Sequence, residues 1–337
     1  FIFVFQLTFI SVTGIFRSNN PLNSFLLFVY GLLLKFIWAL HPLIPTVQKS
    51  NGFLFNDILN LVKTYLDLYP SFYFVITYLL IYTQAVSFNQ LIIRRRLMQK
   101  PNYLPAMSYL LVTSFFSEWN QLSAPLIINT LMIWVWAKMS TLNNSQHPKS
   151  TIYNAGIAIG ICTFLYLPSF AFGVFVILSL IILRPPKATE IFIVIIGIFT
   201  PWYFLAAWLF LTNKLYSFYL SGLDITYSFF QPTNITLTGL ILIFMLIAIG
   251  SFFVQSASSK QVVQVRKNWG LMLLYLLIAL VTPFFDGGYQ LEYWLLALMP
   301  AAAFIGSAFY YPRIKWIPAA LHWVSVAFVL YAQYFHK

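Results

Sequence analysis

The chain has 337 residues, of which 61% are hydrophobic and only 8% are charged, and its mean hydropathy is +0.82. So little polar sequence excludes two soluble domains, although the length alone would allow them. The net charge of +12 does not indicate nucleic-acid binding, because no Lys/Arg stripe alternates with polar sequence. The one cysteine, Cys162, excludes an internal disulfide and a Cys-rich metal site.

The apolar residues gather into runs long enough for membrane helices, which need roughly 17–25 residues each. Residues 1–22 come before the first run, and we expect them to form an N-terminal interfacial segment. The long stretch 152–184 is broken at Leu167-Pro168-Ser169, which predicts a tight helical hairpin. The sequence therefore predicts an all-α bundle, one integral membrane domain over residues 1–337, with about eleven transmembrane spans at 23–43, 71–93, 104–118, 123–140, 152–167, 168–184, 189–213, 236–254, 268–285, 289–310 and 314–334.

The positive residues sort into alternate gaps between these spans. Four fall on one side, at Lys49, Lys63, Lys214 and Lys337, and Lys35 lies inside the first span. The other fourteen share the opposite side: Arg17, Arg94, Arg95, Arg96, Lys100, Lys138, Lys149, Arg184, Lys187, Lys260, Arg266, Lys267, Arg313 and Lys315. Because basic loops stay in the cytoplasm, we predict a cytoplasmic N-terminus, a periplasmic C-terminus and location in a bacterial inner membrane.

The first predicted periplasmic loop, 45–70, has the pattern of an amphipathic helix. Its apolar residues recur at helical spacing, with polar residues between them: Phe53, Leu54, Leu59, Val62, Leu66 and Tyr69 against Asn56, Asp57, Asn60, Lys63 and Asp67. This pattern predicts a helix lying along the membrane surface.

Six of the seven acidic residues fall on or near the predicted outer face: Asp57, Asp67, Glu118, Asp224, Asp286 and Glu292. A carboxylate there can act as a general base or hold a metal ion; the alternative is a solvated loop charge or a helix cap. Asp57 is the first catalytic candidate, because it lies on the amphipathic helix. Glu118 is the second, because it interrupts an otherwise apolar helical hairpin at a depth inside the membrane.

Several cations are candidates for lipid or phosphate binding. Lys35 lies in the middle of a span, where a charge is expensive, so we expect a lipid phosphate or an acid as its partner, with snorkelling as the alternative. Lys63 lies beside Asp57 on the amphipathic helix. Arg94, Arg95 and Arg96 form a topological anchor or a site for lipid headgroups. The four histidines lack the spacing of metal ligands, and no metal site is predicted.

Two stretches carry a family resemblance. One is Gly14-Ile15-Phe16-Arg17-Ser18-Asn19-Asn20-Pro21, before the first span, and the other runs from Arg184-Pro185 through Glu190 to Thr200-Pro201-Trp202. Together they resemble an uncharacterised family of multi-pass inner-membrane proteins that is widespread in Bacteroidota. The resemblance implies a layout that covers the chain from Thr13 onward and supports compartment and architecture more than activity.

The layout is also similar to the GT-C superfamily of polyprenyl-phosphate-dependent glycosyltransferases. Those proteins have a cytoplasmic N-terminus, about eleven or more spans, and a first external loop whose surface helices carry the catalytic acid. The resemblance implies that Asp57 is the base, that Glu118 is a second acid, and that a polyprenyl-linked donor is the substrate. It rests on architecture and is an analogy.

We therefore expect a lipid-linked glycan or envelope-polymer transferase at the periplasmic face, in contact with membrane lipids and, as a transferase, using a divalent metal. The first alternative is a non-catalytic subunit of an envelope assembly or secretion complex, which would bind other membrane proteins through its spans. The second is a lipid or solute transporter. No Walker-type loop, dinucleotide fingerprint or Gly-x-Ser-x-Gly elbow is present in the sequence, so ATP-driven transport by this chain is not expected.

Overall fold

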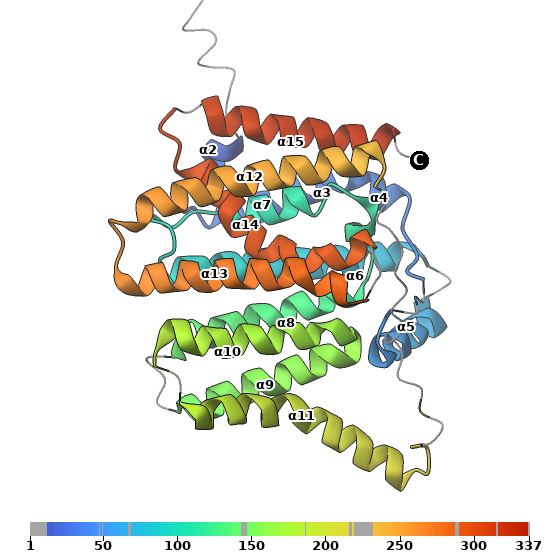
Figure 1. Ribbon diagram of the computed structural model, residues 1–337. Coiled ribbons are helices and arrows are strands. Elements are labelled where there is room, and N and C mark those ends of the chain that lie inside the picture. The colour runs from blue at the N-terminus through green and yellow to red at the C-terminus, as the bar shows by residue number, and fades with distance from the viewer. Residues whose placement is uncertain are drawn as a thin grey trace, which may run out of the picture.

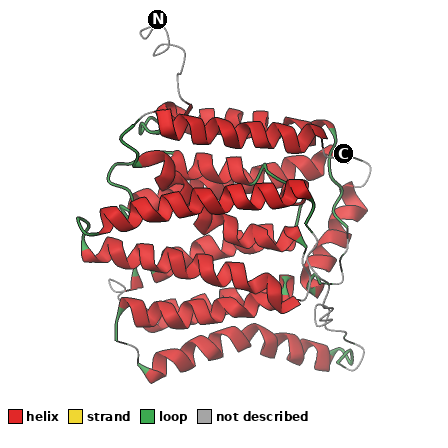
Figure 2. Cartoon of the chain, turned by 45° about the horizontal axis from the view of Figure 1, so that its top comes forward, coloured by secondary structure: helices red, strands yellow, loops and turns green. Residues whose placement is uncertain are grey.

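The computed structural model describes residues 12–46, 48, 50–66, 69–142, 147–185, 187–215, 218, 232–286, 290–314 and 316–335. Within these ranges all regular secondary structure is helical, and the long helices run side by side in one bundle (Figure 1, Figure 2). The all-α prediction is confirmed. The residues at 1–11, which belong to the predicted interfacial segment, lie outside the described part.

The helices follow the apolar runs of the sequence closely. The α-helices are α2 Val12–Phe16, α3 Leu22–Leu34, α4 Phe36–Leu40, α5 Phe53–Leu66, α6 Ser71–Arg94, α7 Leu104–Val112, α8 Ala124–Met139, α9 Pro148–Leu165, α10 Ala171–Leu183, α11 Ala188–Leu211, α12 Asn234–Ser258, α13 Val263–Val281, α14 Leu295–Tyr310 and α15 Trp316–Phe335. Short 3-10 turns join some of them: η1 Ser117–Asn120, η3 Leu167–Phe170, η4 Thr282–Asp286 and η5 Leu291–Trp294. The predicted hairpin is confirmed, since η3 separates α9 from α10 at Pro168.

Among the described residues, six helices are long and apolar enough to cross a membrane: Ser71–Arg94, Ala188–Leu211, Asn234–Ser258, Val263–Phe285, Leu291–Tyr310 and Trp316–Tyr334. Three shorter apolar helices accompany them, Leu22–Leu34, Ala124–Met139 and Leu167–Leu183. The protein is therefore membrane-embedded. The count of eleven spans and the orientation of the chain remain predictions.

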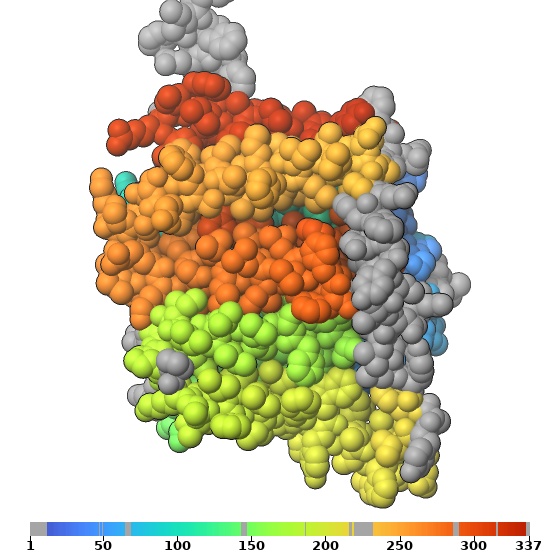
Figure 3. Space-filling view, viewed as in Figure 1, coloured from blue at the N-terminus to red at the C-terminus, as the bar shows by residue number. Residues whose placement is uncertain are grey.

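Helix α14 lies at the centre of the bundle, and every one of its residues is buried. It packs against α7, α12, α13 and α15, and α12 and α13 cover it on the face seen in Figure 3. Glycines permit the closest of these approaches. A β-carbon added at Gly250 of α12 would lie 1.9 Å from the Phe304 carbonyl oxygen of α14. Small residues of this kind set helix–helix distances in membranes, where backbones meet directly.

Helix α11 lies at the edge of the bundle and packs mainly on α9. Gly156 and Gly197 face each other at this crossing, and a β-carbon at Gly197 would lie 2.6 Å from the Tyr153 carbonyl oxygen. Only five of the 24 residues of α11 are buried. Most of this helix therefore faces the surroundings of the protein.

The third predicted span is an interrupted segment. Its helix, α7, has nine residues, all of them buried, and at 1.5 Å per residue it is too short to cross a bilayer alone. The chain then turns through η1, which contains the polar string noted in the sequence, before α8 begins. On η1, Trp119 and Asn120 are buried against neighbouring elements, whereas Glu118 is exposed.

The two ends of the bundle differ in charge. The basic loops of the sequence, which precede α3 and join α6 to α7, α10 to α11, α12 to α13 and α14 to α15, all lie on the left in Figure 1. We call this the basic end. The opposite end holds α5, η1 and η5 with Asp57, Glu118 and Glu292, and we call it the acidic end. This segregation agrees with the charge argument but does not establish the orientation.

Candidate functional site

A polar cluster at the acidic end is built around Glu292. This residue lies on η5, directly before α14, and its side chain is buried, with only 4% of the residue exposed. Carboxylate Oε2 accepts hydrogen bonds from Gln48 Nε2 at 3.1 Å and from Gln121 Nε2 at 3.0 Å. Two amide donors thus fix one carboxylate oxygen in a largely dry environment, which orients the group firmly.

The neighbouring Tyr293 extends this cluster. Its hydroxyl lies 2.8 Å from Ser50 Oγ and donates toward Asn51 Oδ1 at 3.0 Å. Its ring stacks on Tyr166, at the end of α9, with a centroid distance of 4.2 Å and an interplanar angle of 10°. We refer to Gln48, Ser50, Asn51, Gln121, Glu292 and Tyr293 as the Glu292 cluster.

Backbone contacts hold the three segments of the Glu292 cluster in place. The Gly52 N–H donates to the Leu165 carbonyl at 2.8 Å, and a β-carbon at Gly52 would lie 2.1 Å from the Phe164 oxygen. Trp119 Nε1 on η1 donates to the Leu291 carbonyl on η5 at 2.7 Å. These contacts join three segments, namely η1, η5 and the loop that precedes α5, to one another and to the end of α9.

Two buried polar atoms, one in the Glu292 cluster and one next to it, have no hydrogen-bond partner among the described residues. Asn51 is fully buried, and its Nδ2 has no hydrogen-bond partner among the described residues; the same holds for Asn56 Oδ1. Asn56 Nδ2 donates to the Asn51 backbone carbonyl at 3.5 Å, so the Asn56 side chain lies beside the Asn51 backbone. Buried polar atoms without a protein partner usually bind water or a ligand.

The acids chosen from the sequence lie nearby but are exposed. Asp57 lies on the outward face of α5, while Phe55 and Leu59 on the same helix are buried. The amphipathic helix predicted there is thus present, although its position on a membrane surface stays a prediction. Lys63, further along α5, is partly exposed. Glu118 is exposed rather than enclosed, and it accepts a hydrogen bond from Ser117 Oγ at 2.9 Å.

Lys35 is buried, as its mid-span position suggested, but its partners are neutral. It lies at the break between α3 and α4 with 1% of the residue exposed. Its ammonium donates to Thr113 Oγ1 at 3.1 Å and to Asn120 Oδ1. Asn120 Nδ2 in turn donates to the Thr113 and Phe116 carbonyls at 2.9 and 2.7 Å. No described contact joins Lys35 to an acid, and its described partners Thr113 and Asn120 are both neutral.

The residues of the two stretches that carry the family resemblance make contacts within and between helices. Arg184 pairs with the buried Glu190 at 2.7 Å, across the Arg184-Pro185 turn. Asn20 Oδ1 accepts from the Leu22 N–H at 3.0 Å beside Pro21 and so helps to start α3. Arg17 lies over the Tyr310 ring, and Pro201 packs on Gly160. The Thr200 hydroxyl donates a hydrogen bond to the Ile196 carbonyl and lies within hydrogen-bond distance of the Tyr153 hydroxyl.

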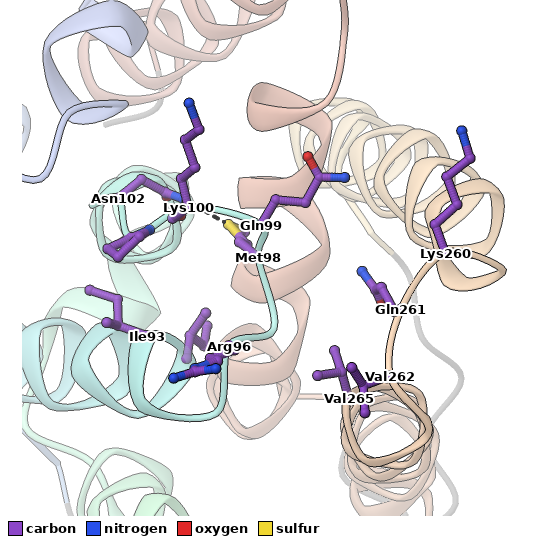
Figure 4. A pocket seen from close by; sticks show the side chains of 12 residues that line it. Ile93, Arg96, Met98, Gln99, Lys100, Asn102, Lys260, Gln261, Val262 and Val265 are labelled. Carbon is purple, nitrogen blue, oxygen red and sulfur yellow. Dashed lines mark hydrogen bonds between the residues drawn. The ribbon is translucent and has the colours of Figure 1, made fainter.

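The basic end carries two open depressions. One, of about 580 Å³, lies between the α6–α7 and α12–α13 loops and is lined by the basic side chains of Arg96, Lys100 and Lys260 and by Val262 and Val265 (Figure 4). Asn102 supports its wall through a hydrogen bond to Met98 Sδ. The other, of about 450 Å³, is a groove between α6 and α8 that ends at Arg94. Two arginines of the Arg94-Arg95-Arg96 run therefore line these depressions, Arg96 the first and Arg94 the second.

Glu292, Gln48 and Gln121 were not chosen from the sequence as site residues. Glu292 alone left a signal there, as an acid directly before a long apolar run. The two glutamines gave none, because they lie 244 and 171 residues away from it in the chain. Among the described residues, no group of three or more His, Cys, Asp or Glu side chains could hold a metal ion.

Residues 47–337 match the model of a family of unknown function, DUF6427. The chain belongs to this family. The matched region begins just before Gln48 and contains every residue of the Glu292 cluster, so this cluster lies within the part that matches DUF6427. No curated protein and no solved structure matches the chain. Membership therefore gives a family without an activity.

Proposed function

We propose that this DUF6427 protein is a transferase that acts on a lipid-linked glycan or envelope-polymer precursor at the acidic end of the bundle. The observation that carries the proposal is the buried Glu292 carboxylate, held by Gln48 and Gln121 from two distant segments. In such a transfer the acceptor hydroxyl bonds to the transferred group while a carboxylate takes up its proton, and the bond between that group and the polyprenyl phosphate breaks, so that the lipid phosphate leaves with the bonding electron pair. In Glu292 the two amides hold Oε2, which leaves Oε1 of the same carboxylate to accept the proton.

Asp57 and Glu118 are additional carboxylates at the same end. Both are exposed, so they can meet a substrate that arrives from water or from the lipid–water boundary. Asp57, which the sequence suggested as the base, and Glu292 are therefore two alternative candidates for the general base of the same proposed reaction. Asn51 Nδ2, which is buried and has no partner among the described residues, is a donor suited to a sugar hydroxyl or a phosphate oxygen of the precursor.

The test follows the pool of polyprenyl-linked precursors in a deletion strain complemented with variants. We expect the deletion to accumulate the precursor, measured by mass spectrometry of lipid extracts, and wild-type protein to clear it. Glu292→Gln keeps the shape and removes the charge, so turnover should fall by about a hundredfold, the usual scale for losing an acid–base group. Asp57→Asn and Glu118→Gln, in the same assay, decide which carboxylate acts.

Glu190→Gln is the matched control, because Glu190 is also 4% exposed but lies at the basic end. It should lower thermal stability and leave precursor turnover unchanged. If the deletion strain has the precursor pool of the wild type, the protein is not this transferase. If none of the three carboxylate variants at the acidic end slows turnover, the proposed site is wrong.

The alternative function, a non-catalytic subunit of an envelope complex, is favoured by α11. Its outward face carries exposed aromatic residues, among them Tyr203, Phe204, Trp208 and Phe210. Such a face suits a second membrane protein as well as lipid. Photo-crosslinkers at Phe204 and Trp208 distinguish the two, because a subunit should give one discrete protein adduct and a transferase that works alone should give lipid adducts only.

A further inference from the structure

The lipid-exposed face of α6 carries a polar stripe over half of its length. Four exposed residues, Thr83, Ser87, Gln90 and Arg94, follow one another at spacings of four, three and four. At 3.6 residues per turn they fall within about 60° of the helix circumference. Towards the acidic end the same face is apolar, with Leu79 and Phe72 exposed. A polar stripe facing hydrocarbon is expensive and marks a functional surface.

The stripe forms one wall of the groove between α6 and α8. The opposite wall consists of Thr130, Ile133, Trp134 and Ala137 on α8. Gln84 closes the floor, since its amide donates to Thr130 Oγ1 at 2.8 Å and to the Leu126 carbonyl at 2.7 Å. The groove has a volume of about 450 Å³, within the usual range for small-molecule sites.

Three side chains of the stripe have hydrogen-bonding groups to spare. Thr83 Oγ1 is satisfied by the Leu79 carbonyl at 2.8 Å, but Ser87, Gln90 and Arg94 make no hydrogen bond with the described residues. The basic end of the groove gathers positive charge: Arg94 lines it, and Lys138 lies 5.5 Å from the centre of the Trp134 ring on the other wall. Partial burial and the charge of Arg94 lower the pKa of the adjacent Arg95 guanidinium. A bound anion would relieve this repulsion.

The length of the stripe identifies its occupant. From Thr83 to Arg94 the helix rises about 16 Å, which is half of a hydrocarbon core of roughly 30 Å. A partner helix would cross both leaflets and would meet the apolar half of the face as well. A phospholipid occupies one leaflet, with its phosphate at the boundary and its ester groups a few ångströms deeper.

We propose that the groove between α6 and α8 binds one anionic phospholipid, with its phosphate at Arg94 and its polar ester region at Gln90 and Ser87. Arginine recognises phosphate oxygens with paired N–H donors, and basic pockets between membrane helices recognise anionic headgroups. This inference does not depend on the proposed transferase activity.

The test is native mass spectrometry of the full-length protein in detergent, titrated with phosphatidylglycerol or phosphatidylethanolamine. We expect one phosphatidylglycerol to bind about tenfold more tightly than phosphatidylethanolamine. Arg94→Gln removes the phosphate partner and should weaken phosphatidylglycerol binding about tenfold, the scale of a charge-assisted hydrogen bond. The double variant Ser87→Leu/Gln90→Leu fills the groove and should have the same effect while Arg94 is intact.

Arg313→Gln is the matched control, an exposed arginine of the basic end that lies in the loop between α14 and α15 and does not line the groove. It should bind phosphatidylglycerol like the wild type. Equal loss in Arg94→Gln and Arg313→Gln would mean general attraction to basic loops and would overturn the proposal. Displacement of the lipid by millimolar inorganic phosphate would also overturn it, because the ligand would then be a free anion.

A Ser87→Cys variant separates the lipid from a partner helix. The natural Cys162 is fully buried, so the new thiol is the accessible one. A membrane-permeant crosslinker attached there should yield monomeric protein alone if a lipid fills the groove. A discrete crosslinked protein band would show that another polypeptide occupies this face, and the proposal would fail.

Discussion

Helices α11 and α14 are both apolar segments of the same bundle, but their surroundings are opposite. Helix α11 is the more apolar of the two, yet it buries only five of its 24 residues, whereas all residues of α14 are buried. Hydropathy therefore does not separate core from surface here, because lipid is as apolar as a protein interior. Residue size does: α14 contains seven Ala, Gly or Ser residues among 16, and α11 is rich in Phe, Trp and Tyr.

The largest effect is expected from a substitution that forces the central helix α14 away from α12. In Gly250→Ala the new β-carbon would lie 1.9 Å from the Phe304 carbonyl oxygen, and backbone cannot yield as a side chain can. We expect a loss of about 5 kcal/mol in the free energy of unfolding, so that no monodisperse protein is recovered by size-exclusion chromatography.

Gly270→Ala on α13 is the control for Gly250→Ala, since its nearest neighbour would be Ile182 Cγ2 at 3.9 Å. It should equal or exceed the wild type in stability, because alanine favours a helix over glycine by up to about 1 kcal/mol. If both variants behave alike, the α12–α14 contact is looser than described.

Large-to-small changes probe the same contrast. Phe304 of α14 is 2% exposed and Phe204 of α11 is 65% exposed. Phe304→Ala leaves a cavity in the bundle and should lower the unfolding free energy by about 3 kcal/mol. Phe204→Ala should change it by less than about 0.5 kcal/mol. The measurement is thermal unfolding in detergent, and a large loss for Phe204→Ala would mean that α11 is covered by a partner.

The attachment of α11 to α9 can be weakened without touching the centre. Gly197→Ala brings a β-carbon within 2.6 Å of the Tyr153 carbonyl oxygen, which should cost about 1–3 kcal/mol. Hydrogen exchange should rise in α11 and α9 and stay unchanged in α14. Uniformly raised exchange would contradict a peripheral α11 and indicate a single cooperative unit.

The smallest expected effect concerns one hydrogen bond on the same crossing. Trp202 Nε1 donates to Thr163 Oγ1 at 2.9 Å, and such bonds between membrane helices contribute about 0.6 kcal/mol on average. Trp202→Phe should lower stability by about that amount, and the same change at Trp323, which is 46% exposed on α15, should have no measurable effect. A larger loss at Trp202 would make α11 better anchored than its exposure suggests.

The helices of this protein could be predicted from the sequence, because apolar runs and Pro168 mark their extents and breaks. The amphipathic pattern around Asp57 likewise located α5. The central place of α14 could not be predicted, since nearly uniform apolar character leaves no periodicity to show which face is inside. Nor could the Glu292 cluster, because Gln48 and Gln121 approach Glu292 only through tertiary contacts across 244 and 171 residues.

In the candidate site, too, the sequence predicted where a side chain lies better than which groups it contacts. Burial of Lys35 followed from its position in an apolar run, but its neutral partners Thr113 and Asn120 did not. The sequence suggested an acid or a lipid phosphate as the partner of Lys35, because a charge inside an apolar run needs compensation. The chain instead uses Lys35 to tie the α3–α4 break to η1, and it leaves the acids Asp57 and Glu118 exposed.

The pairing of Lys35 with residues far along the chain has a consequence for how the protein is made. Thr113 and Asn120 follow Lys35 by 78 and 85 residues, and at about 5–20 residues per second a ribosome needs roughly 4–17 s to add 85 residues. Until then the Lys35 side chain lacks these partners, and a lysine inside a membrane segment costs up to about 2.5–3.5 kcal/mol. We therefore expect the insertion machinery to hold α3 and α4 until η1 has been synthesised, so that this part of the chain settles in lipid only after a segment about 80 residues downstream has emerged.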